Sequence, residues 1–506
     1  MQVYFHTFGC KANQYDTEKM RQELEARGAR SADGWNRAEV CVVNTCTVTR
    51  NADAEARRIV RKMRRENPGA RIVVAGCSAA LRAPEYREMD GVSGVVEGQD
   101  PMAVAESVTR AARRPPGGSA GKVSGSGSGS AGSGLIQLGL EAPLDRVDQE
   151  PVGAEILSRR EGMTRGWLKI QDGCDRKCAF CATRLARGAS RSRPPREIVR
   201  EARALARHHP ELVLTGIHIG HYGKDLGGEA DDALGGEASL STLLRRLLDQ
   251  VPDVRFRLGS IEATEVDDLL LDLLAGSGGR VAPHLHMPLQ SGADPVLRRM
   301  RRWHTREMYR TRALEIASRM DVLGLGADII TGFPGETEED HARTRDLVDE
   351  LPYTYLHVFP FSPRDGTAAA DLVETDPVPE RVAGERSREL RELVLEKERS
   401  YLKGRLGGRV RAVVEGDGRR ALTGDYLRVG VRRDPGRRAG PGSGGFGREG
   451  SGEGGFGQAR SDQKGSAAEH SGEDGFGTEA PRGGGSGLIS GALQGTPDDP
   501  YIVLSR

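Results

Sequence analysis

The chain has 506 residues, of which 37% are hydrophobic, 5% aromatic and 29% charged. This length predicts several domains, and the lack of an apolar run of about 18 residues excludes a membrane-spanning protein. The formal net charge of +1 excludes a globally basic nucleic-acid binder, so any nucleic acid must be bound by local basic patches.

The N-terminus and the cysteines indicate a cellular compartment. Residues 1–10 lack the basic and long apolar segments of a secretory signal. Seven cysteines in such a chain favour metal binding or catalysis over a disulfide framework. We therefore expect a cytoplasmic protein with no membrane partner.

Residues 1–114 alternate apolar runs with helical patterns, which predicts a doubly wound parallel α/β domain. The expected strands are residues 3–8, 40–43, 72–75 and 92–96. The expected helices are residues 16–27, 53–66 and 103–112. A flexible linker rich in glycine and serine, with a lead-in to the next domain, is expected at residues 115–160.

Residues 161–402 contain six successive strand–helix units, which predicts a partial parallel (βα)6 barrel with its chemistry on the loops that follow the strands. The expected strands are residues 167–170, 212–215, 254–258, 284–287, 327–330 and 355–359. The expected helices are residues 195–207, 240–249, 266–274, 295–320, 338–350 and 379–402. An insert rich in glycine and acidic residues is expected at 224–239.

Residues 403–506 are expected to form a small β-barrel that a disordered, glycine-rich insert interrupts at about 434–487. The β-type runs are residues 409–415, 421–431 and 501–504. Residues 401–438 contain eleven Lys or Arg and four Asp or Glu, which makes a local basic patch. Its candidates for phosphate contact, unless they form an ordinary solvated face, are Arg409, Arg411, Arg428, Arg432 and Arg433.

Cys174, Cys178 and Cys181 follow the first expected barrel strand at the spacing Cys-x3-Cys-x2-Cys. Three thiolates so close in sequence can hold one metal centre. A structural zinc usually takes a fourth protein ligand, whereas a 4Fe-4S cluster with three cysteines leaves one iron open to a small molecule. Zinc and buried structural cysteines are the alternatives.

Cys10, Cys46 and Cys77 each come directly after an expected strand of the first domain. Because the carboxyl ends of parallel strands share one edge of the sheet, these three can converge and hold a second cluster. Any one of them alone would more often be a small buried apolar residue. Cys41 falls inside a strand and is assigned to the core.

The cysteine motif after the first barrel strand resembles the radical S-adenosylmethionine (SAM) superfamily, and the surrounding sequence resembles the methylthiotransferase family. The matching segments are residues 7–14, 43–49, 75–77, 187–193, 214–217, 260–262, 284–292, 328–336 and 359–362. Residues 10–14 and 44–49 are similar to the branch that acts on N6-threonylcarbamoyladenosine beside the tRNA anticodon. The C-terminal barrel resembles the family's RNA-binding TRAM domain, apart from its insert.

This resemblance implies a tRNA-modifying enzyme that replaces the C2 hydrogen of the modified adenine with a methylthio group. It implies SAM and two 4Fe-4S clusters as cofactors. It assigns Cys174, Cys178 and Cys181 to the cluster that cleaves SAM, and Cys10, Cys46 and Cys77 to the cluster that presents a methylated sulfur to the activated carbon. A small electron-donor protein, such as a flavodoxin or ferredoxin, is implied as a partner beside tRNA.

Other residues are supporting candidates. The candidates for SAM contact, each at a strand end where a plain turn or loop is the alternative, are Thr215, Gly216, Ser260, Glu262 and Gln290. Asn13, Asn44 and Thr45 are candidates for orienting the first-domain cluster. The arginine-rich run 298–303 offers one aromatic side chain for stacking on RNA, or is an exposed helix end.

Two further interpretations remain open. The same chemistry could modify a ribosomal-protein side chain or another modified tRNA adenosine. A non-catalytic, zinc-stabilised RNA-binding protein is the interpretation from a different functional class.

Overall fold

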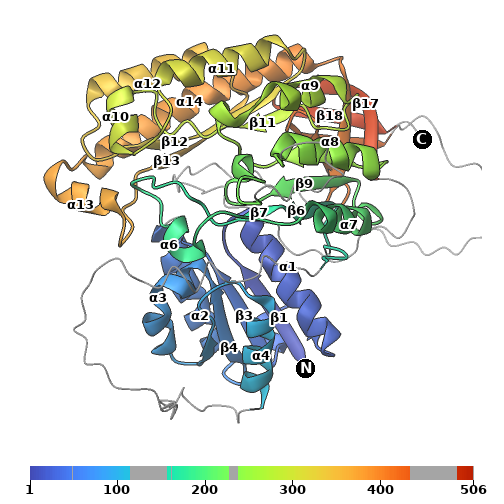
Figure 1. Ribbon diagram of the computed structural model, residues 1–506, viewed down its shortest axis with the longest axis vertical. Coiled ribbons are helices and arrows are strands. Elements are labelled where there is room, and N and C mark those ends of the chain that lie inside the picture. Colours follow the sequence, from blue (N-terminus) through green and yellow to red (C-terminus); the bar gives the residue numbers. More distant parts are fainter. Residues whose placement is uncertain (48–49, 114–155, 161, 227–237, 434–486, 505–506) are drawn as a thin grey trace, which may run out of the picture.

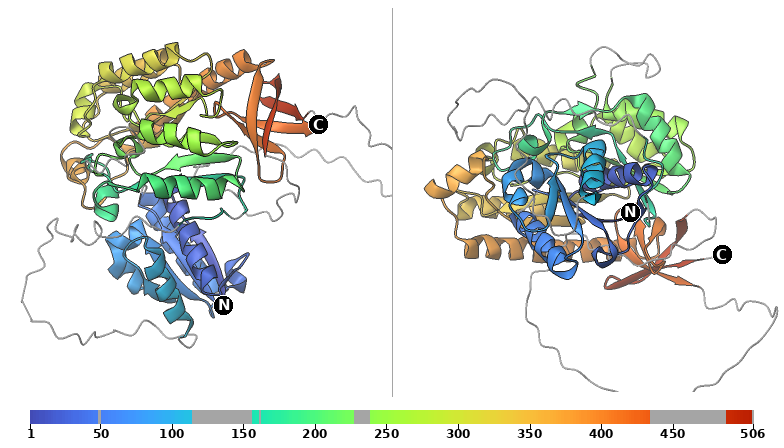
Figure 2. Two further views of the ribbon diagram at one scale, coloured as in Figure 1. Left: turned by 45° about the vertical axis from the view of Figure 1, so that its right-hand side comes forward. Right: turned by 90° about the horizontal axis from the view of Figure 1, so that it is seen from below.

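The computed structural model describes residues 1–47, 50–113, 156–160, 162–226, 238–433 and 487–504. Most of the expected linker, most of the acidic insert and nearly all of the glycine-rich insert lie outside the described residues. Within the described part of the chain, no helix combines the length and the apolar character needed to cross a membrane. The described residues form three units, which lie side by side in Figures 1 and 2.

The first unit is a parallel five-stranded sheet of order β2-β1-β3-β4-β5 with helices on both faces. Its strands are β1 (Gln2–Thr7), β2 (Arg30–Ser31), β3 (Val40–Thr45), β4 (Arg71–Gly76) and β5 (Val92–Val95). Its helices are α1 (Lys11–Ala26), η1 (Trp35–Arg37), α2 (Arg50–Glu66), α3 (Cys77–Arg87) and α4 (Pro101–Ala112). Every residue of β3 is buried because apolar clusters cover both faces, and Cys41 belongs to one of them, as expected.

The second unit is the expected partial barrel of six parallel strands. Two sheets, β10-β9-β6 and β11-β12-β13, are joined by bridges that pair Phe256 with Val281 and Ser260 with His286. The strands are β6 (Arg165–Lys169), β9 (Glu211–Thr215), β10 (Arg255–Leu258), β11 (His284–His286), β12 (Gly324–Thr331) and β13 (Tyr355–Pro360). The α/β fold class that the sequence predicts is confirmed.

Helices cover the outer face of this barrel (Figure 1). They are α7 (Pro195–Ala206), α8 (Leu240–Gln250), α9 (Asp268–Gly276), α10 (Asp294–Arg299), α11 (Arg306–Ser318), α12 (Glu338–Glu350) and α14 (Glu380–Arg405). Helix α13 (Ala368–Thr375) instead packs on the loop of the barrel cysteines, where the Ala369 amide donates to the carbonyl of Ala179. The shorter elements are β7 (Gln171–Asp172), α6 (Thr183–Arg187), β8 (Arg191–Ser192), η2 (Ile219–His221) and η4 (Ala263–Glu265). The single helix expected at 295–320 was wrong: Arg301 has a φ of 55° and Thr305 caps a new helix, so α10 and α11 are separate.

The third unit is a closed barrel of order β14-β15-β16-β18-β17. Its strands are β14 (Arg409–Glu415), β15 (Arg420–Thr423), β16 (Arg428–Arg433), β17 (Leu488–Thr496) and β18 (Asp499–Leu504). The single run expected at 421–431 was wrong. It is two antiparallel strands, because the chain turns at Tyr426, which has a φ of 70°.

Buried arginines attach the third unit to the second. Arg255 Nη1 donates to the carbonyl of Arg411 at 2.8 Å. Arg257 donates to the carbonyls of Gly424 and Thr423 at 2.9 and 2.8 Å. Glu211 on β9 accepts from both arginines, and all three side chains are at most 1% exposed. The closed barrel is therefore fixed to the partial barrel by bonds that water does not reach.

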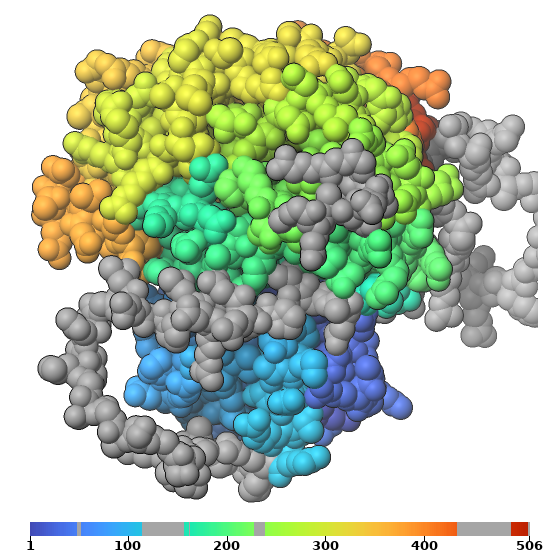
Figure 3. Space-filling model, viewed as in Figure 1, coloured from blue at the N-terminus to red at the C-terminus, as the bar shows by residue number. Residues whose placement is uncertain are grey.

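Helix α1 attaches the first unit to the second (Figure 1), and the two units are neighbours in the space-filling view (Figure 3). Tyr15 belongs to the barrel's apolar core and donates to Glu201 at 3.1 Å. Lys169 Nζ lies 2.6 Å from Asp16 Oδ1 and 2.5 Å from Asp172 Oδ2. The end of the expected linker is also held, since the backbone of Leu157 donates to Glu201. The first unit therefore docks on the barrel in one defined orientation.

Candidate functional site

Cys10, Cys46 and Cys77 lie together at the carboxyl edge of the first sheet. Cys10 precedes α1, Cys46 follows β3, and Cys77 is the first residue of α3. A Cβ atom added at Gly9, whose φ is 88°, would overlap Cys46 Sγ, so the loop that carries Cys10 lies directly on Cys46. Burial raises the pKa of Cys77, Arg187 opposes that shift, and the nearby Cys10 thiol adds to it.

Asn13 and Thr45 hold these cysteine loops in place. Asn13 Nδ2 donates to the carbonyls of Phe8 at 2.6 Å and Thr45 at 3.1 Å, which ties the loop after β1 to the loop after β3. Thr45 Oγ1 donates to Ala75 on β4 and accepts from the backbone of Ala79 in α3. Three thiols from three strand ends are thus held as one group, a donor set that fits an iron–sulfur cluster.

Cys174, Cys178 and Cys181 lie in the loop between β7 and α6. The Cys174 amide donates to Gly188, and the Cys181 amide donates to Cys178, which folds the loop on itself. Burial, with smaller contributions from the thiols of Cys181 and Cys178, raises the pKa of Cys174 to about 12. This second group of three thiols also fits a cluster, because a bound metal deprotonates such thiols.

Charged and aromatic side chains surround this barrel triad. Arg302 Nη1 lies 3.7 Å from Cys178 Sγ, and Nη2 of the same guanidinium lies 2.5 Å from Glu262 Oε2. Trp303 lies between two guanidinium groups, those of Arg176 at 3.7 Å and Arg302 at 4.2 Å from the ring centroid. Glu262 is thus the SAM candidate that shares a partner with the barrel cysteines, and Arg302, at 3% exposure, is not part of an exposed helix end.

Thr215 and Gly216 lie at the end of β9, against Gln171. A Cβ atom on Gly216 would lie 2.8 Å from the Gln171 carbonyl oxygen. The Gln171 side chain accepts from the amides of Ile217 and His218 at 3.1 and 2.8 Å. Close packing against Gln171 therefore accounts for the glycine, and the SAM contact stays a prediction.

Ser260 and Gln290 lie together with β11 and β12. Ser260 Oγ is 2.8 Å from His286 Nδ1. Gln290 has a φ of 70°, and its backbone pairs with Asp328 and Ile330. The five SAM candidates therefore fall into three places, and only Glu262 is linked to a cysteine through a common partner.

Arg187 is a residue of this site to which the sequence assigned no role. It ends α6, the short helix that begins two residues after Cys181. Arg187 Nε donates to Cys77 Sγ at 3.2 Å, and its other nitrogens donate to Asp172, Asn13 and Asp16. One five-residue helix therefore leads from the barrel triad to the first-domain triad. The segment 187–193 was part of the family resemblance, which was the available signal.

Four of the five candidates for phosphate contact are exposed on the third unit. The side chains of Arg409 and Arg411 point to the outer face of β14. Those of Arg428 and Arg432 point to the outer face of β16. Arg432 also lies over the ring of Tyr501, at 3.8 Å from its centroid. The side chain of Arg433 lies outside the described residues. The arrangement presents positive charge on the outer surface of the barrel.

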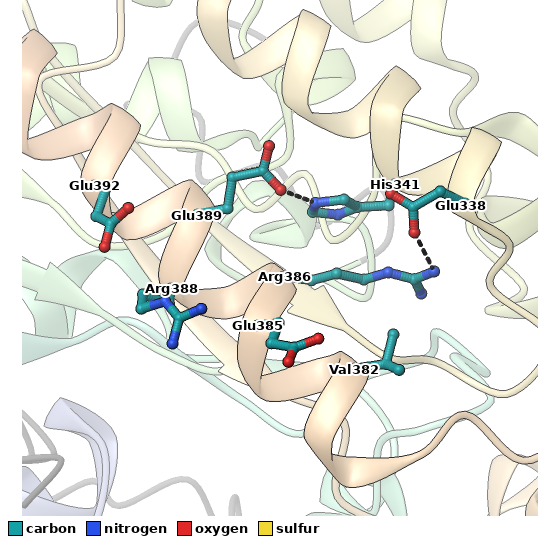
Figure 4. Close-up of a pocket in the computed structure, with 8 residues that line it drawn as sticks. All are labelled: Glu338, His341, Val382, Glu385, Arg386, Arg388, Glu389 and Glu392. Atoms are coloured by element: carbon teal, nitrogen blue, oxygen red, sulfur yellow. Dashed lines mark hydrogen bonds and ion pairs between the residues drawn. The ribbon is translucent and has the colours of Figure 1, made fainter.

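A polar cavity of about 350 Å³ lies between α12 and α14 (Figure 4). His341 and Glu389 pair across it at 2.8 Å, and Arg386 pairs with Glu338 at 3.2 Å. No cysteine lines it. It is a gap between paired charges on the outer helices, and its lining shares no residue with the two thiol groups.

Sequence comparisons identify the family. Residues 2–97 match the model described as uncharacterized protein family UPF0004, and residues 168–348 match the radical SAM superfamily. The chain is 36% identical over 388 residues to the threonylcarbamoyladenosine tRNA methylthiotransferase MtaB of Bacillus subtilis, covering 76% of this chain and 78% of that protein. The chain belongs to the methylthiotransferase family of radical SAM enzymes.

Other members and a solved structure are also similar. Within the family, the tRNA-2-methylthio-N(6)-dimethylallyladenosine synthase of Oceanobacillus iheyensis is 31% identical over 422 residues, covering 82% of this chain and 74% of that protein. The solved structure of the radical S-adenosylmethionine methyltransferase TsrM from Kitasatospora setae aligns with a TM-score of 0.49 at 17% identity. That alignment covers 74% of this chain and 78% of the TsrM chain.

Proposed function

We propose that this enzyme methylthiolates C2 of N6-threonylcarbamoyladenosine beside the tRNA anticodon, using SAM and two 4Fe-4S clusters. The observation that carries the proposal is the pair of thiol groups, one in each of two docked units, with α6 between them. The relative named for threonylcarbamoyladenosine, at 36% identity, supports the choice of substrate. The exposed arginines of the third unit support tRNA as the partner.

Each thiol group has a role in the proposal. Cys174, Cys178 and Cys181 would hold the cluster that serves SAM, and Cys10, Cys46 and Cys77 would hold the second. Iron–sulfur clusters bound there would supply the one-electron reduction of SAM and a site that presents sulfur to the substrate. The C2–H bond is not acidic, so replacing its hydrogen requires radical chemistry of this kind. A small electron-donor protein, such as a flavodoxin or ferredoxin, completes the proposed set of partners.

The chain's own residues position and shield these groups. Arg302 keeps a positive charge beside Cys178 and orients Glu262, whose pKa burial raises and Arg302 lowers in part. We propose that Glu262 contacts SAM, with Thr215, Gly216, Ser260 and Gln290 as weaker candidates. The docking of α1 on the barrel buries the charged groups of Lys169, Asp16 and Arg187 in the interface between the two units.

Iron content tests the two sites. The full-length protein, reconstituted without oxygen, should bind about eight irons per chain, four for each cluster. C77A should retain about four irons and still cleave SAM under dithionite, because the barrel triad is intact. C178A should also retain about four irons but lose SAM cleavage. Zinc at one per chain with no iron would instead indicate the non-catalytic RNA-binding protein.

A reaction on defined tRNA tests the substrate. The reconstituted enzyme is incubated with SAM, dithionite and tRNA that carries either N6-threonylcarbamoyladenosine or dimethylallyladenosine, and the nucleosides are analysed by mass spectrometry. We expect a methylthio product with the first tRNA. A product with only the second tRNA would assign the chain the activity named for its 31% identical relative.

A further inference from the structure

Three side chains on neighbouring strands of the partial barrel form a cluster that the proposed function does not use. His286 ends β11, Asp328 lies within β12, and His357 lies within β13. Their potential ligand atoms all lie within 4.8 Å of one another. The neighbouring residues in the sequence, Leu285 on β11 and Ile329 on β12, belong to the apolar core beneath the helices. Because side chains alternate along a strand, the cluster faces the inner side of the barrel.

The distances within the cluster match those between ligands of one metal ion. His286 Nε2 lies 3.3 Å and His357 Nδ1 lies 3.2 Å from Asp328 Oδ1. Ligand atoms bound 2.0–2.1 Å from a tetrahedral zinc lie about 3.3 Å apart. Two edges of such a tetrahedron are thus already present. The side chain of His357 is 48% exposed, so this ligand lies at the solvent side of the cluster.

His286 is held as a metal-binding histidine would be. Its Nδ1 is 2.8 Å from the hydroxyl of Ser260, which fixes the orientation of the ring. Its Nε2 is buried, and its polar neighbour is Asp328 Oδ1 at 3.3 Å, a contact outside hydrogen-bond geometry. The ring of Tyr355 stacks on it at 5.9 Å. A metal ion held by both Nε2 and Oδ1 would replace this long contact with two ligand bonds.

The charge of the cluster also suits a cation. Within the described part of the chain, Asp328 ion-pairs with the two imidazoles and with no lysine or arginine. The other histidine–carboxylate cluster, His218, His221 and Glu265, differs, because Arg176 already pairs with Glu265 at 3.1 Å. Asp328 therefore keeps a negative charge that a bound cation would neutralise.

We infer that His286, Asp328 and His357 form a binding site for one divalent transition-metal ion, with Zn²⁺ as the representative ligand, separate from both thiol groups. Two imidazoles and one carboxylate suit zinc or ferrous iron, whereas magnesium prefers oxygen ligands. Three protein ligands leave at least one coordination position of the ion open toward the inner side of the barrel. The inference does not depend on which nucleoside the enzyme modifies.

Equilibrium dialysis of the full-length, cluster-loaded protein against buffered Zn²⁺, with metals counted by mass spectrometry, tests the site. We expect one zinc per chain beyond the iron, not displaced by millimolar Mg²⁺. D328N should weaken zinc binding at least tenfold, and S260A should weaken it about tenfold to a hundredfold, as loss of a ligand's hydrogen-bond partner does. H357Q removes a half-exposed ligand, so it should weaken zinc binding without affecting folding.

H341Q is the matched control, because His341 also pairs with a single carboxylate but lies in the polar cavity of the outer helices. It should bind zinc as the wild type does, and all variants should retain their iron. If D328N and H357Q bind zinc as tightly as the wild type, the zinc lies elsewhere and the inference is wrong. If D328N keeps its zinc but loses affinity for tRNA, the cluster contacts the nucleic acid and is not a metal site.

Discussion

Arg187 Nε donates to Cys77 Sγ at 3.2 Å, although 110 residues separate the two. The same guanidinium pairs with Asp172 and Asp16 at 2.9 Å, and Lys169 pairs with both of these carboxylates. Two positive and two negative charges thus balance inside the interface between the first unit and the barrel. Such a buried network stabilises one docked arrangement only while every member is present.

R187Q should therefore destabilise the protein by about 3–5 kcal/mol, because Asp172 and Asp16 lose a buried partner. R187K should lose less stability than R187Q, because lysine keeps the positive charge. It cannot replace the planar guanidinium, which donates to four groups at once. Chemical denaturation of the full chain measures both effects. R58Q is the control, because Arg58 is exposed and pairs only with its helix neighbour Glu55; its transition should match the wild type. An R187Q transition unchanged from wild type would contradict the role of the network.

G9A should prevent Cys10, Cys46 and Cys77 from binding iron. A Cβ atom at Gly9 would overlap Cys46 Sγ, and the φ of 88° disfavours any side chain there. We expect about four of eight irons to remain after anaerobic reconstitution, measured by colorimetric iron assay. G28A is a close control, because Gly28 has a φ of 84° but no atom within 4 Å of an added Cβ. Equal iron in the two variants would show that contact with Cys46 is unimportant.

E211Q should change how stability depends on pH. Burial raises the pKa of Glu211, but Arg257 and Arg255 more than offset this and lower it to about 2. A carboxylate whose pKa is lower in the folded state adds stability above its unfolded pKa of about 4.3, and this stability is lost as pH falls toward 2. E211Q should be destabilised at pH 7, and the difference from wild type should shrink by about 2 kcal/mol between pH 4.5 and 2.

Denaturation of both proteins at several pH values between 7 and 2 measures this difference. A constant difference over the whole range would show that the ionised Glu211 does not hold the arginines of the barrel interface.

R428Q should weaken tRNA binding and its dependence on salt. Arg428 is exposed on β16, beside Arg432 on the same outward face. Removing one arginine–phosphate ion pair lowers the slope of log K against log salt by about 0.7–0.9. Filter binding from 50 to 300 mM KCl measures that slope. R310Q on α11 removes an exposed arginine that pairs with Glu350, and it should leave the slope unchanged. Equal slopes for R428Q and wild type would exclude this face as a tRNA-binding surface.

The sequence predicted the fold class because its strands are strongly apolar and its helices strongly periodic. The six barrel strands were each placed within three residues of the observed bounds. It missed α3, which starts at Cys77 and contains Pro84, a residue that argues against a helix. It also missed β17, whose glycines and polar residues lack strand character. Hydrogen bonding to β14 and β18 stabilises the extended conformation of β17, which its own residues do not favour.

Residues of the candidate site could be predicted from the sequence only where a motif spacing or a position at a strand end indicates a metal-binding or catalytic role. The six cysteines met that condition, and their role as cluster ligands stays a prediction. Arg187 and Arg302 did not, because an arginine in a basic segment is usually exposed. Their importance comes from burial beside Cys77 and Cys178, which only the tertiary structure reveals. Ser260 was assigned to SAM, yet its hydroxyl partner is His286.

The position of β18 between β16 and β17 sets the order in which the third unit assembles during translation. β18 pairs parallel to β16 and antiparallel to β17, and it is the last of the five strands to leave the ribosome. Until it emerges, β16 and β17 have no common neighbour, and the sheet keeps two open edges. The nascent chain thus completes both thiol-bearing units before the barrel that carries the exposed arginines closes.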